Sequence, residues 1–401
     1  MSHSSNSLDL DLATKLSTNS NRLTRRTYGF DEISLVPGSY TLDIELCDTT
    51  FVIDKFSFKV PIIASAMDSV TNVNTVTLLS NLGAMGVLNL QGLQTRYDNP
   101  DEILDQIAKC DDSKFIELFQ KLYLKPIDEK LIVKRIAELK ANNARVVVSV
   151  TPNFADKYLP LLIDSDIDIL VVQSTVTGLI HKSVTGSASL NVEKFCKKAP
   201  FPVIVGNCVT YKTAYDLMEA GVSAILVGIG PGAACTSRSV LGIGVPMATA
   251  IADCAQAKID YAAKTGRYVS IVADGGMIGA GDICKAIACG ADAAMIGSPL
   301  AKAKEAPGRG YHWGMATPSP ILPRGTRVKV GSIGSMEEIL FGPATIDDGS
   351  LNLIGALQTS MATLGASNLK EMQNIEIVIA PSILKEGKFY QSAQGLGMGR
   401  S

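Results

Sequence analysis

The sequence predicts a single large (β/α)8 barrel, and three observations lead to this fold class. First, eight short apolar runs recur along the chain, each bounded by turn residues. Second, most of these runs are separated by segments long enough for a helix, which is the pattern of βαβ units. Third, the runs are continuously apolar, as expected for parallel strands that helices cover on both faces. The runs lie at 61–65, 85–90, 146–150, 169–173, 202–206, 224–228, 270–274 and 293–297.

The two ends of the chain are expected to lie outside this barrel. Residues 1–24 are rich in Ser and Asn and have no apolar period, so they predict a disordered tail. The stretch 41–60 alternates in character and predicts a β-hairpin at the entry to the fold. We place one catalytic barrel domain at 25–385 and a flexible C-terminal tail at 386–401.

Two segments interrupt the regular alternation of strands and helices. Between the second and third strands, residues 95–143 predict a helical insertion with two or three extra helices. After the eighth strand, residues 305–343 are rich in Gly and Pro. Loops longer than about 12–15 residues in compact domains tend to be functional lids or disordered, and we expect a lid here. Elsewhere, segments such as 211–221 and 281–290 have helical period and end in Gly, which is preferred just after a helix.

Composition and charge narrow the possible classes of function. The chain has 37 basic and 39 acidic side chains, a balance that provides no electrostatic attraction to nucleic acid or an anionic membrane. No apolar run reaches the ~18 residues that span a bilayer, and the N-terminus lacks the pattern of a secretory signal, so we expect a cytoplasmic protein. Eight cysteines without a CxxC pair and three histidines give no zinc pattern. Chemistry based on a single sulfur remains the simplest possibility.

The segments that follow the strands are rich in Gly, Ser, Asn and Asp, as expected for a ligand-lined barrel mouth. Gly275 and Gly276 follow the seventh strand, and Gly297 and Ser298 follow the eighth, which is where such barrels bind phosphate. Pro299 fits the first helical position, so Ser298 is predicted to be an N-cap beside a phosphate site. Plain capping and a tight turn are the alternative. Asp274 ends the seventh strand and suits ribose hydroxyls, although an Asx-turn is also compatible with this position.

The loop after the sixth strand contains the predicted nucleophile. Gly228, Gly230 and Gly232 surround Pro231 and require unusual backbone geometry, and Cys235 follows within reach of the cavity. A thiolate is a strong nucleophile, and such a loop can also turn its carbonyls toward a monovalent cation. A buried structural cysteine is the alternative. In the lid, His312 and Trp313 come just before Gly314, Met315 and Ala316, where they either pack the lid or contact a base and its phosphate.

Together these motifs resemble the IMP dehydrogenase/GMP reductase family. The resemblance covers about residues 25–385 and is closest to IMP dehydrogenase-related proteins of cyanobacteria and actinobacteria, which lack the regulatory CBS pair. The helical insertion after the second strand is too short for that pair. The matching motifs are FDEISLVP (30–37), SAMD (65–68), GNCVT (206–210), VGIGPGAACTSR (227–238), ADGG (273–276), MIGSPLA (295–301), EAPG (305–308) and WGMAT (313–317).

The resemblance implies a reaction and a set of roles. Cys235, in a loop with Thr236 and Ser237, would attack C2 of IMP, hydride would leave to NAD⁺, and the thioimidate would be hydrolysed to XMP. Carbonyls of Gly230, Gly232 and Cys235 would hold K⁺, and the enzyme would be a homotetramer, with an octamer as an alternative. The nicotinamide side would comprise Gln173, Ser174, Thr175, Asn207 and Gly228. The nucleotide would be held by Ser65, Met67, Ala233, Asp274, Gly275, Gly276, Gly297, Ser298, His312, Gly314, Met315 and Ala316.

The chain departs from the family pattern at several positions. Ala233 replaces a serine common in dehydrogenases, Gln173 replaces the usual aspartate, and His312 replaces a tyrosine. The flap Arg-Tyr pair that activates water is not recognisable, and Arg324 and Arg327 are our substitutes for it. Arginine can act as a base only if its surroundings lower its pKa far below the usual value above 12.

Three other functions stay open at this stage. A GMP reductase, which converts GMP to IMP with NADPH, is favoured by Pro231, Thr236 and Arg238. Against it, Arg324 occupies the position of the reductase glutamate, and the segments EAPG and MATAI (247–251) are similar to dehydrogenases. The altered flap and Gln173 also fit a nucleotide-binding regulator without turnover. A flavin barrel would bind phosphate in the same place, and purified protein without colour would argue against it.

Overall fold

Parallel strands close into a barrel in the computed structural model, which describes residues 25–178, 190–314, 326–381, 383 and 386–397. Every pair of neighbouring barrel strands is parallel. The predicted second strand is divided into β5 (Met85–Gly86), which pairs with β4, and β6 (Leu88–Asn89), which pairs with β7, so this one segment closes the ring. The other barrel strands are β4 (Ile62–Ala64), β7 (Val147–Val150), β8 (Ile169–Gln173), β9 (Val203–Cys208), β10 (Ala224–Val227), β11 (Ser270–Asp274) and β12 (Ala293–Ile296). Each lies in one of the predicted apolar runs, except that β9 continues two residues beyond its run, and the predicted (β/α)8 fold is confirmed.

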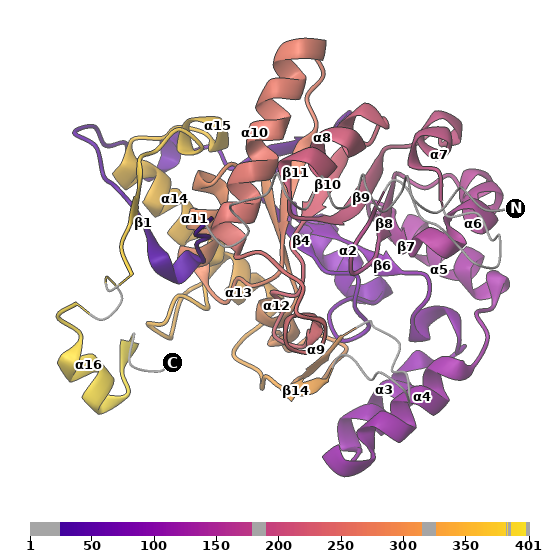
Figure 1. Ribbon diagram of the computed structural model, residues 1–401. Coiled ribbons are helices and arrows are strands. Elements are labelled where there is room, and N and C mark those ends of the chain that lie inside the picture. Colours follow the sequence, from indigo (N-terminus) through magenta and orange to yellow (C-terminus); the bar gives the residue numbers. More distant parts are fainter. Residues whose placement is uncertain (1–24, 179–189, 315–325, 382, 384–385, 398–401) are drawn as a thin grey trace, which may run out of the picture.

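Helices surround the strands and bury their apolar faces against them (Figure 1). As expected, α8 (Tyr211–Glu219) and α11 (Ala280–Ala288) are followed by glycines in the left-handed region, Gly221 with φ +95° and Gly290 with φ +110°. The helices that follow successive strands are α2 (Val73–Asn81), α5 (Glu129–Ala141), α6 (Pro152–Asp164), α7 (Val192–Lys198), α8 (Tyr211–Glu219), α10 (Met247–Thr265), α11 (Ala280–Ala288) and α14 (Leu353–Leu364).

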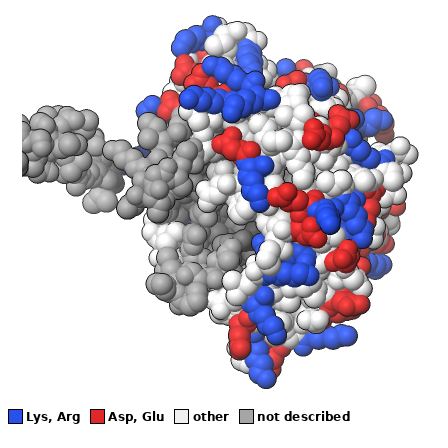
Figure 2. All heavy atoms as spheres, turned by 90° about the vertical axis from the view of Figure 1, so that its right-hand side faces the viewer, with Lys and Arg blue, Asp and Glu red and all other residues white. Residues whose placement is uncertain are grey.

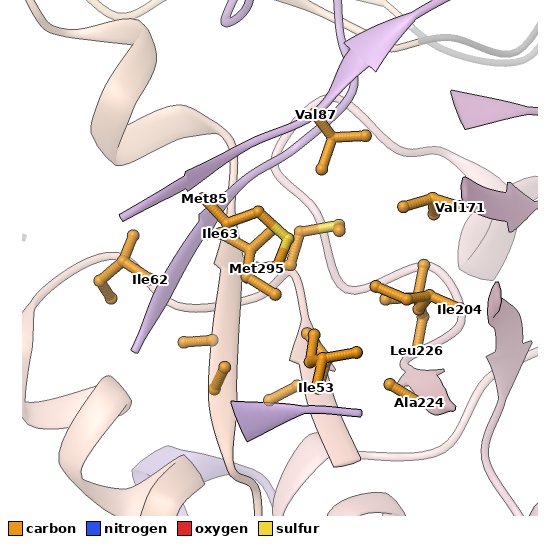
Figure 3. Close-up of a cluster of buried hydrophobic side chains, with 14 of the residues drawn as sticks. Ile53, Ile62, Ile63, Met85, Val87, Val171, Ile204, Ala224, Leu226 and Met295 are labelled. Carbon is orange, nitrogen blue, oxygen red and sulfur yellow. The ribbon is translucent and has the colours of Figure 1, made fainter. Parts of the chain in front are cut away.

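The predicted entry hairpin is present and consists of β2 (Phe51–Ile53) and β3 (Phe56–Phe58). Ile53 is fully buried, and Figure 3 shows it among the side chains of the barrel strands. The Ser270 hydroxyl, at the beginning of β11, donates a hydrogen bond of 2.7 Å to the Val52 carbonyl. The hairpin therefore closes the N-terminal end of the barrel, and the C-terminal strand ends are left for a ligand.

The helical insertion has a small core of its own beside the barrel. Its extra helices are α3 (Pro100–Lys109) and α4 (Phe115–Leu124), whereas α5 packs into the main core. Trp313, 1% exposed, belongs to the core of the insertion. It lies on β13 (Tyr311–Trp313), which pairs with β14 (Arg327–Lys329) at the base of the predicted lid, next to α3 and α4 (Figure 1). The described strands on either side of the predicted lid are thus anchored on the insertion as well as on the barrel.

The remaining elements lie at the periphery. In the predicted C-terminal tail the structure has a short helix, α16 (Phe389–Gln394). Among the described residues no helix is both long enough and apolar enough to cross a membrane. Figure 2 shows basic and acidic side chains interspersed on the face drawn, without a field of one sign. The other elements are β1 (Ile33–Leu35), which pairs with β15 (Ile377–Ile379), and the helices α9 (Ser237–Leu241), α12 (Ser298–Ala301), α13 (Met336–Phe341) and α15 (Leu369–Met372).

Candidate active site

A cavity of about 440 Å³ opens at the C-terminal ends of the barrel strands. Of the predicted site residues that the structure describes, all except Arg327 line it. Met315, Ala316 and Arg324 lie outside the described residues. The predicted residues that line the cavity are Ser65, Met67, Gln173, Ser174, Thr175, Asn207, Gly228, Gly230, Gly232, Ala233, Cys235, Thr236, Ser237, Asp274, Gly275, Gly276, Gly297, Ser298, His312 and Gly314.

The loop after β10 requires glycine at its first residue, because the backbone there lies against the end of β11. Gly228 has φ +149°, and a Cβ there would lie 2.3 Å from the Asp274 carbonyl oxygen. Gly230 has φ +70°, which L side chains rarely adopt. These two residues let the chain turn sharply across the end of the barrel and present the residues that follow to the cavity.

Cys235 is exposed, in contrast to most of the other cysteines. Its amide donates to the Gly232 carbonyl at 2.9 Å, which closes a tight turn just before α9. Its Sγ lies 3.3 Å from Ser237 Oγ, a polar partner on the first residue of that helix. The thiol is therefore accessible to a ligand in the cavity, as a nucleophile must be.

Asp274 presents a carboxylate at the end of β11. Asn207, on β9, donates to Asp274 Oδ2 through its side-chain amide at 2.7 Å. Burial raises the pKa of Asp274 to about 6, and the Asn207 hydrogen bond acts in the opposite direction. The carboxylate keeps acceptor capacity toward the cavity, which suits the hydroxyl groups of a sugar.

His312 lies against Gly297 at the strand-eight side of the cavity. A Cβ at Gly297 would be 3.0 Å from His312 Cε1, so a larger residue there would push the ring from its position. Burial lowers the pKa of His312 to about 4, which keeps the imidazole neutral at pH 7. Its Nδ1 lies 3.0 Å from Ser69 Oγ, which in turn accepts the Trp313 amide proton at 3.4 Å. If the Ser69 hydroxyl donates to Nδ1, Nε2 carries the proton and is a donor toward an anion.

The residues of the predicted phosphate cradle lie at two adjacent strand ends. Gly275 and Gly276 have φ +81° and +77°, and a Cβ at Gly276 would lie 2.8 Å from Pro231 Cβ. The prediction that Ser298 is an N-cap is wrong, because Gly297 is the N-cap of α12 and Ser298 is its first residue. The proline that follows is tolerated in the first turn, where backbone N–H groups have no partner within the helix. Ser298 still lines the cavity.

Residues 174–177, which follow β8, are fixed next to Asn207 by hydrogen bonds of their hydroxyl groups and of the Thr177 amide. Ser174 Oγ donates to the Val176 carbonyl at 2.7 Å and lies 3.2 Å from Thr177 Oγ1. Thr177 Oγ1 donates to the Gly206 carbonyl at 2.6 Å. These contacts place the predicted nicotinamide residues along one wall of the cavity.

Arg327 does not contribute to the cavity. Its guanidinium donates to the Ile107 and Cys110 carbonyls at the end of α3 and forms an ion pair with Asp112. It also lies over the rings of Tyr311 and Phe115, 4.4 and 4.9 Å from the centroids. With a side chain 2% exposed and directed into the insertion, Arg327 has contacts that do not support our hypothesis that it activates water.

Two cavity residues from the insertion were missed in the sequence. Arg96 and Tyr123 both line the cavity, and they are joined there by Gln91, Ser149 and Thr151 from neighbouring strand ends. Gln91 and Thr151 lie in segments that follow predicted strands, whereas Ser149 lies within the predicted strand at 146–150. No local pattern distinguishes Arg96 or Tyr123, since they reach the cavity only through the packing of the insertion.

A metal site made of charged ligands is not present in the part of the chain that the structure describes, where no group of three or more His, Cys, Asp or Glu side chains could hold an ion. The predicted K⁺ site depends on backbone carbonyls of Gly230, Gly232 and Cys235 instead. Uncharged oxygen donors on a turn of this kind suit a monovalent cation, so the donor set fits the ion. That site stays a prediction.

Comparisons with known proteins agree with this geometry. A family model described as the IMP dehydrogenase / GMP reductase domain matches residues 27–317. A protein of Mycolicibacterium smegmatis described as an uncharacterized oxidoreductase is 37% identical, covering 89% of this chain and 98% of its own length. Inosine-5'-monophosphate dehydrogenase of Cryptosporidium parvum is 29% identical over 86% of this chain and 89% of its own. A crystal structure of an IMP dehydrogenase/GMP reductase-like protein from Corynebacterium glutamicum superimposes with a TM-score of 0.83 at 36% identity, covering 89% of this chain and 95% of that one.

Proposed function

Because the chain belongs to the IMP dehydrogenase/GMP reductase family, a family of oxidoreductases, we propose that it oxidises IMP to XMP with NAD⁺ in guanine nucleotide synthesis. One observation carries this proposal: the exposed Cys235 thiol shares a cavity with the Asp274 carboxylate and with the glycine-lined pocket beside His312. An acceptor for ribose and donors for phosphate are the groups that bind a nucleoside monophosphate. The nucleophile is the group that a covalent reaction on its base requires.

In this proposal the nucleotide is bound by its two polar ends. Asp274 accepts hydrogen bonds from ribose hydroxyls, and the backbone at Gly276 and Ser298 holds the phosphate together with the neutral His312 imidazole. Fixing both ends brings C2 of the purine to Cys235 Sγ, and such positioning of reacting atoms provides much of the rate enhancement. The Cys235 thiolate would add to C2, and NAD⁺ held in the same cavity would supply the oxidant that takes up the hydride. Water would then cleave the carbon–sulfur bond.

The wall opposite the nucleotide serves the cofactor. Gln173, Ser174 and Thr175 face the same cavity as Asn207, which is fixed by its hydrogen bond to Asp274. We assign the nicotinamide to this side, and K⁺ to the carbonyls of the Cys235 loop. We also expect the enzyme to act in the cytoplasm as a homotetramer or an octamer, by analogy with the family.

The proposal is tested with purified protein. Incubation with IMP and NAD⁺ should produce reduced cofactor, followed by its absorbance, and Cys235→Ser should abolish this while IMP binding is retained. Cys196→Ser is the matched control, because burial raises the pKa of Cys196 to about 11 and its half-buried thiol is expected to be inert.

The same assay with GMP and NADPH tests the second candidate. Thr236 and Arg238, which flank the nucleophile, are similar to those of GMP reductases, and Arg238 donates to the Ile229 carbonyl at 3.2 Å beneath the loop. Consumption of NADPH with GMP, without reaction of IMP, would establish a reductase. Binding of either nucleotide without turnover would instead indicate a regulator.

A further inference from the structure

Asp68 is a buried carboxylate in the wall between the cavity and the helical insertion. It is 0% exposed, and its Oδ2 accepts hydrogen bonds from the Tyr123 hydroxyl at 2.5 Å and from the Leu93 amide at 2.9 Å. No described residue donates to its Oδ1. A Cβ at Gly92 would lie 2.1 Å from Oδ1, so the carboxylate packs directly against a bare backbone. A buried acceptor that is only partly satisfied is costly to keep and needs an explanation.

Tyr123 connects this carboxylate to the cavity. The residue lies on α4, and the cavity is lined by Tyr123 but not by Asp68. Its hydroxyl donates to Asp68 and accepts the Trp313 indole proton at 3.3 Å. A phenolic oxygen can accept two hydrogen bonds, so one acceptor position remains for a molecule in the cavity. The ring is fixed by Phe119, 4.3 Å away between centroids.

Arg96 places a positive charge next to this pair. It lines the cavity, and its guanidinium donates to the carbonyls of Gln91, at 3.1 and 3.2 Å, and of Lys125. The guanidinium lies over the Tyr123 ring, 5.8 Å from the centroid. Its charge favours the ionised form of Asp68, the form that accepts a proton.

We infer that Tyr123 and Asp68 form a proton relay that activates the water which hydrolyses the covalent intermediate. The inference rests on the proposed function. The water oxygen bonds to the purine carbon, one of its protons moves to the Tyr123 oxygen, and the Tyr123 proton moves to Asp68. The carbon–sulfur bond then breaks and its electron pair returns to the Cys235 sulfur. The second water proton stays on the product as its hydroxyl tautomer, and Asp68 releases its proton to solvent.

The proton affinities agree with this direction of transfer. Burial raises the pKa of Tyr123 well above its usual range, so the phenol stays protonated at rest. It can therefore relay a proton only by accepting one from water as it gives its own to Asp68. Burial also raises the pKa of Asp68 to about 6. A general base is most effective when its pKa lies near the working pH, and this value is close to neutral pH. The charged and titratable groups that face Asp68 are Tyr123 from α4 and Arg96 after the 3-10 helix at Leu93–Thr95.

Tyr123→Phe is the decisive variant, because it removes the relay oxygen and keeps the ring. Rapid mixing with IMP and NAD⁺ should still give one burst of reduced cofactor per active site, while kcat falls about 100-fold, as is typical for loss of a general base. Intact-mass measurement of the quenched variant should show the Cys235 adduct accumulating. Tyr97→Phe is the matched control, since its hydroxyl donates to the Leu122 carbonyl at 3.0 Å beside the same small core and does not line the cavity.

Asp68→Asn provides a second, independent readout. For the wild type, hydrolysis should slow as the pH falls below about 6, where Asp68 takes up a proton and stops accepting one. In Asp68→Asn this acid limb should be absent and kcat low throughout, whereas a merely structural role would leave the limb in place. IMP binding, measured by calorimetry, shows that each variant is folded.

The outcomes separate the two proposals. Wild-type kcat in folded Tyr123→Phe, or loss of the burst instead of the later hydrolysis, would overturn the relay and leave the proposed function intact. A wild-type protein that forms no adduct with IMP and NAD⁺ would overturn both.

Discussion

Asp274 is fixed by a single amide donor, and its remaining acceptor capacity faces the cavity. Because burial raises the pKa of this carboxyl to about 6, its charge changes in an accessible pH range. An ionised carboxylate accepts hydrogen bonds from ribose hydroxyls, and a bound ribose therefore lowers the pKa again. Recognition of the sugar should be complete above this pKa and should be lost as the pH falls through it.

We therefore expect the KM for IMP to rise below about pH 6 in the wild type, while the relay at Asp68 changes kcat in the same range. Asp274→Asn should raise KM at pH 8 about 10-fold or more, since a charged hydrogen bond contributes ~1.5–3 kcal/mol, and KM should then vary little with pH. Initial rates at several IMP concentrations between pH 5 and 8 measure this. A KM that is unchanged in the variant would remove the ribose role.

At the scale of elements, the loop from Gly228 to Cys235 is held by backbone contacts more than by side chains. The Gly232 carbonyl is already bonded to the Cys235 amide, and Arg238 from α9 supports the loop from below through the Ile229 and Val245 carbonyls. A cation bound to the loop carbonyls would hold the thiol in its attacking position.

This proposal predicts that replacing K⁺ by Li⁺ slows turnover about 10-fold or more, because the smaller ion cannot contact widely spaced carbonyls without losing its water shell. The measurement is kcat in dialysed enzyme at constant ionic strength, with thermal melting as the check that the fold is intact. Equal rates in both salts would argue against a cation at this loop.

Arg327, on β14, joins the pair β13 and β14 to the insertion through hydrogen bonds to the end of α3. Arg327→Lys should lose the forked hydrogen bonds to the Ile107 and Cys110 carbonyls and lower the free energy of unfolding by ~1–3 kcal/mol, measured by urea titration. Arg309→Lys, whose side chain is partly exposed and pairs with Asp101 and Asp105 on α3, should change stability by less than ~0.5 kcal/mol. We expect kcat of the folded Arg327 variant to stay within about threefold of wild type. A large loss of kcat without loss of stability would restore the hypothesis that Arg327 activates water.

For the whole molecule, the sequence predicts those parts of the fold and site that depend on residues adjacent in the chain. The barrel strands were predictable because both faces of each strand are buried, which makes the runs continuously apolar. The turn at Cys235 was predictable because side chains other than glycine rarely adopt the backbone angles of Gly228 and Gly230. By contrast, Arg96 and Tyr123 lie far apart in the chain and meet at the cavity only when α4 packs beside β13. Arg327 was misjudged for the same reason, since its surroundings come from a different segment.

The end of the barrel opposite the cavity contains a buried ion pair that joins distant parts of the chain. Lys258, on α10, lies 3.1 Å from Asp292 Oδ2 just before β12, with side chains 4% and 8% exposed. Tyr268 and Gln373 donate to the same carboxylate, and Lys258 also donates to the Gly290 carbonyl at 3.0 Å. This charged cluster thus connects α10, the start of β12 and the end of α15, and none of its residues lines the cavity.

Breaking a buried pair by removing one partner leaves a buried charge without compensation, which costs ~3–5 kcal/mol. Lys258→Met should lower the free energy of unfolding by about that amount, measured by urea titration. Lys264→Met on the same helix, whose side chain is 64% exposed and 3.4 Å from Glu219, should change it by less than ~1 kcal/mol. Because the pair lies at the hairpin end of the barrel, KM and kcat of the folded Lys258 variant should match those of the wild type. Equal stability of the two lysine variants would mean that the hydrogen bonds from Tyr268, Gln373 and the Ile271 amide are enough to keep Asp292 buried.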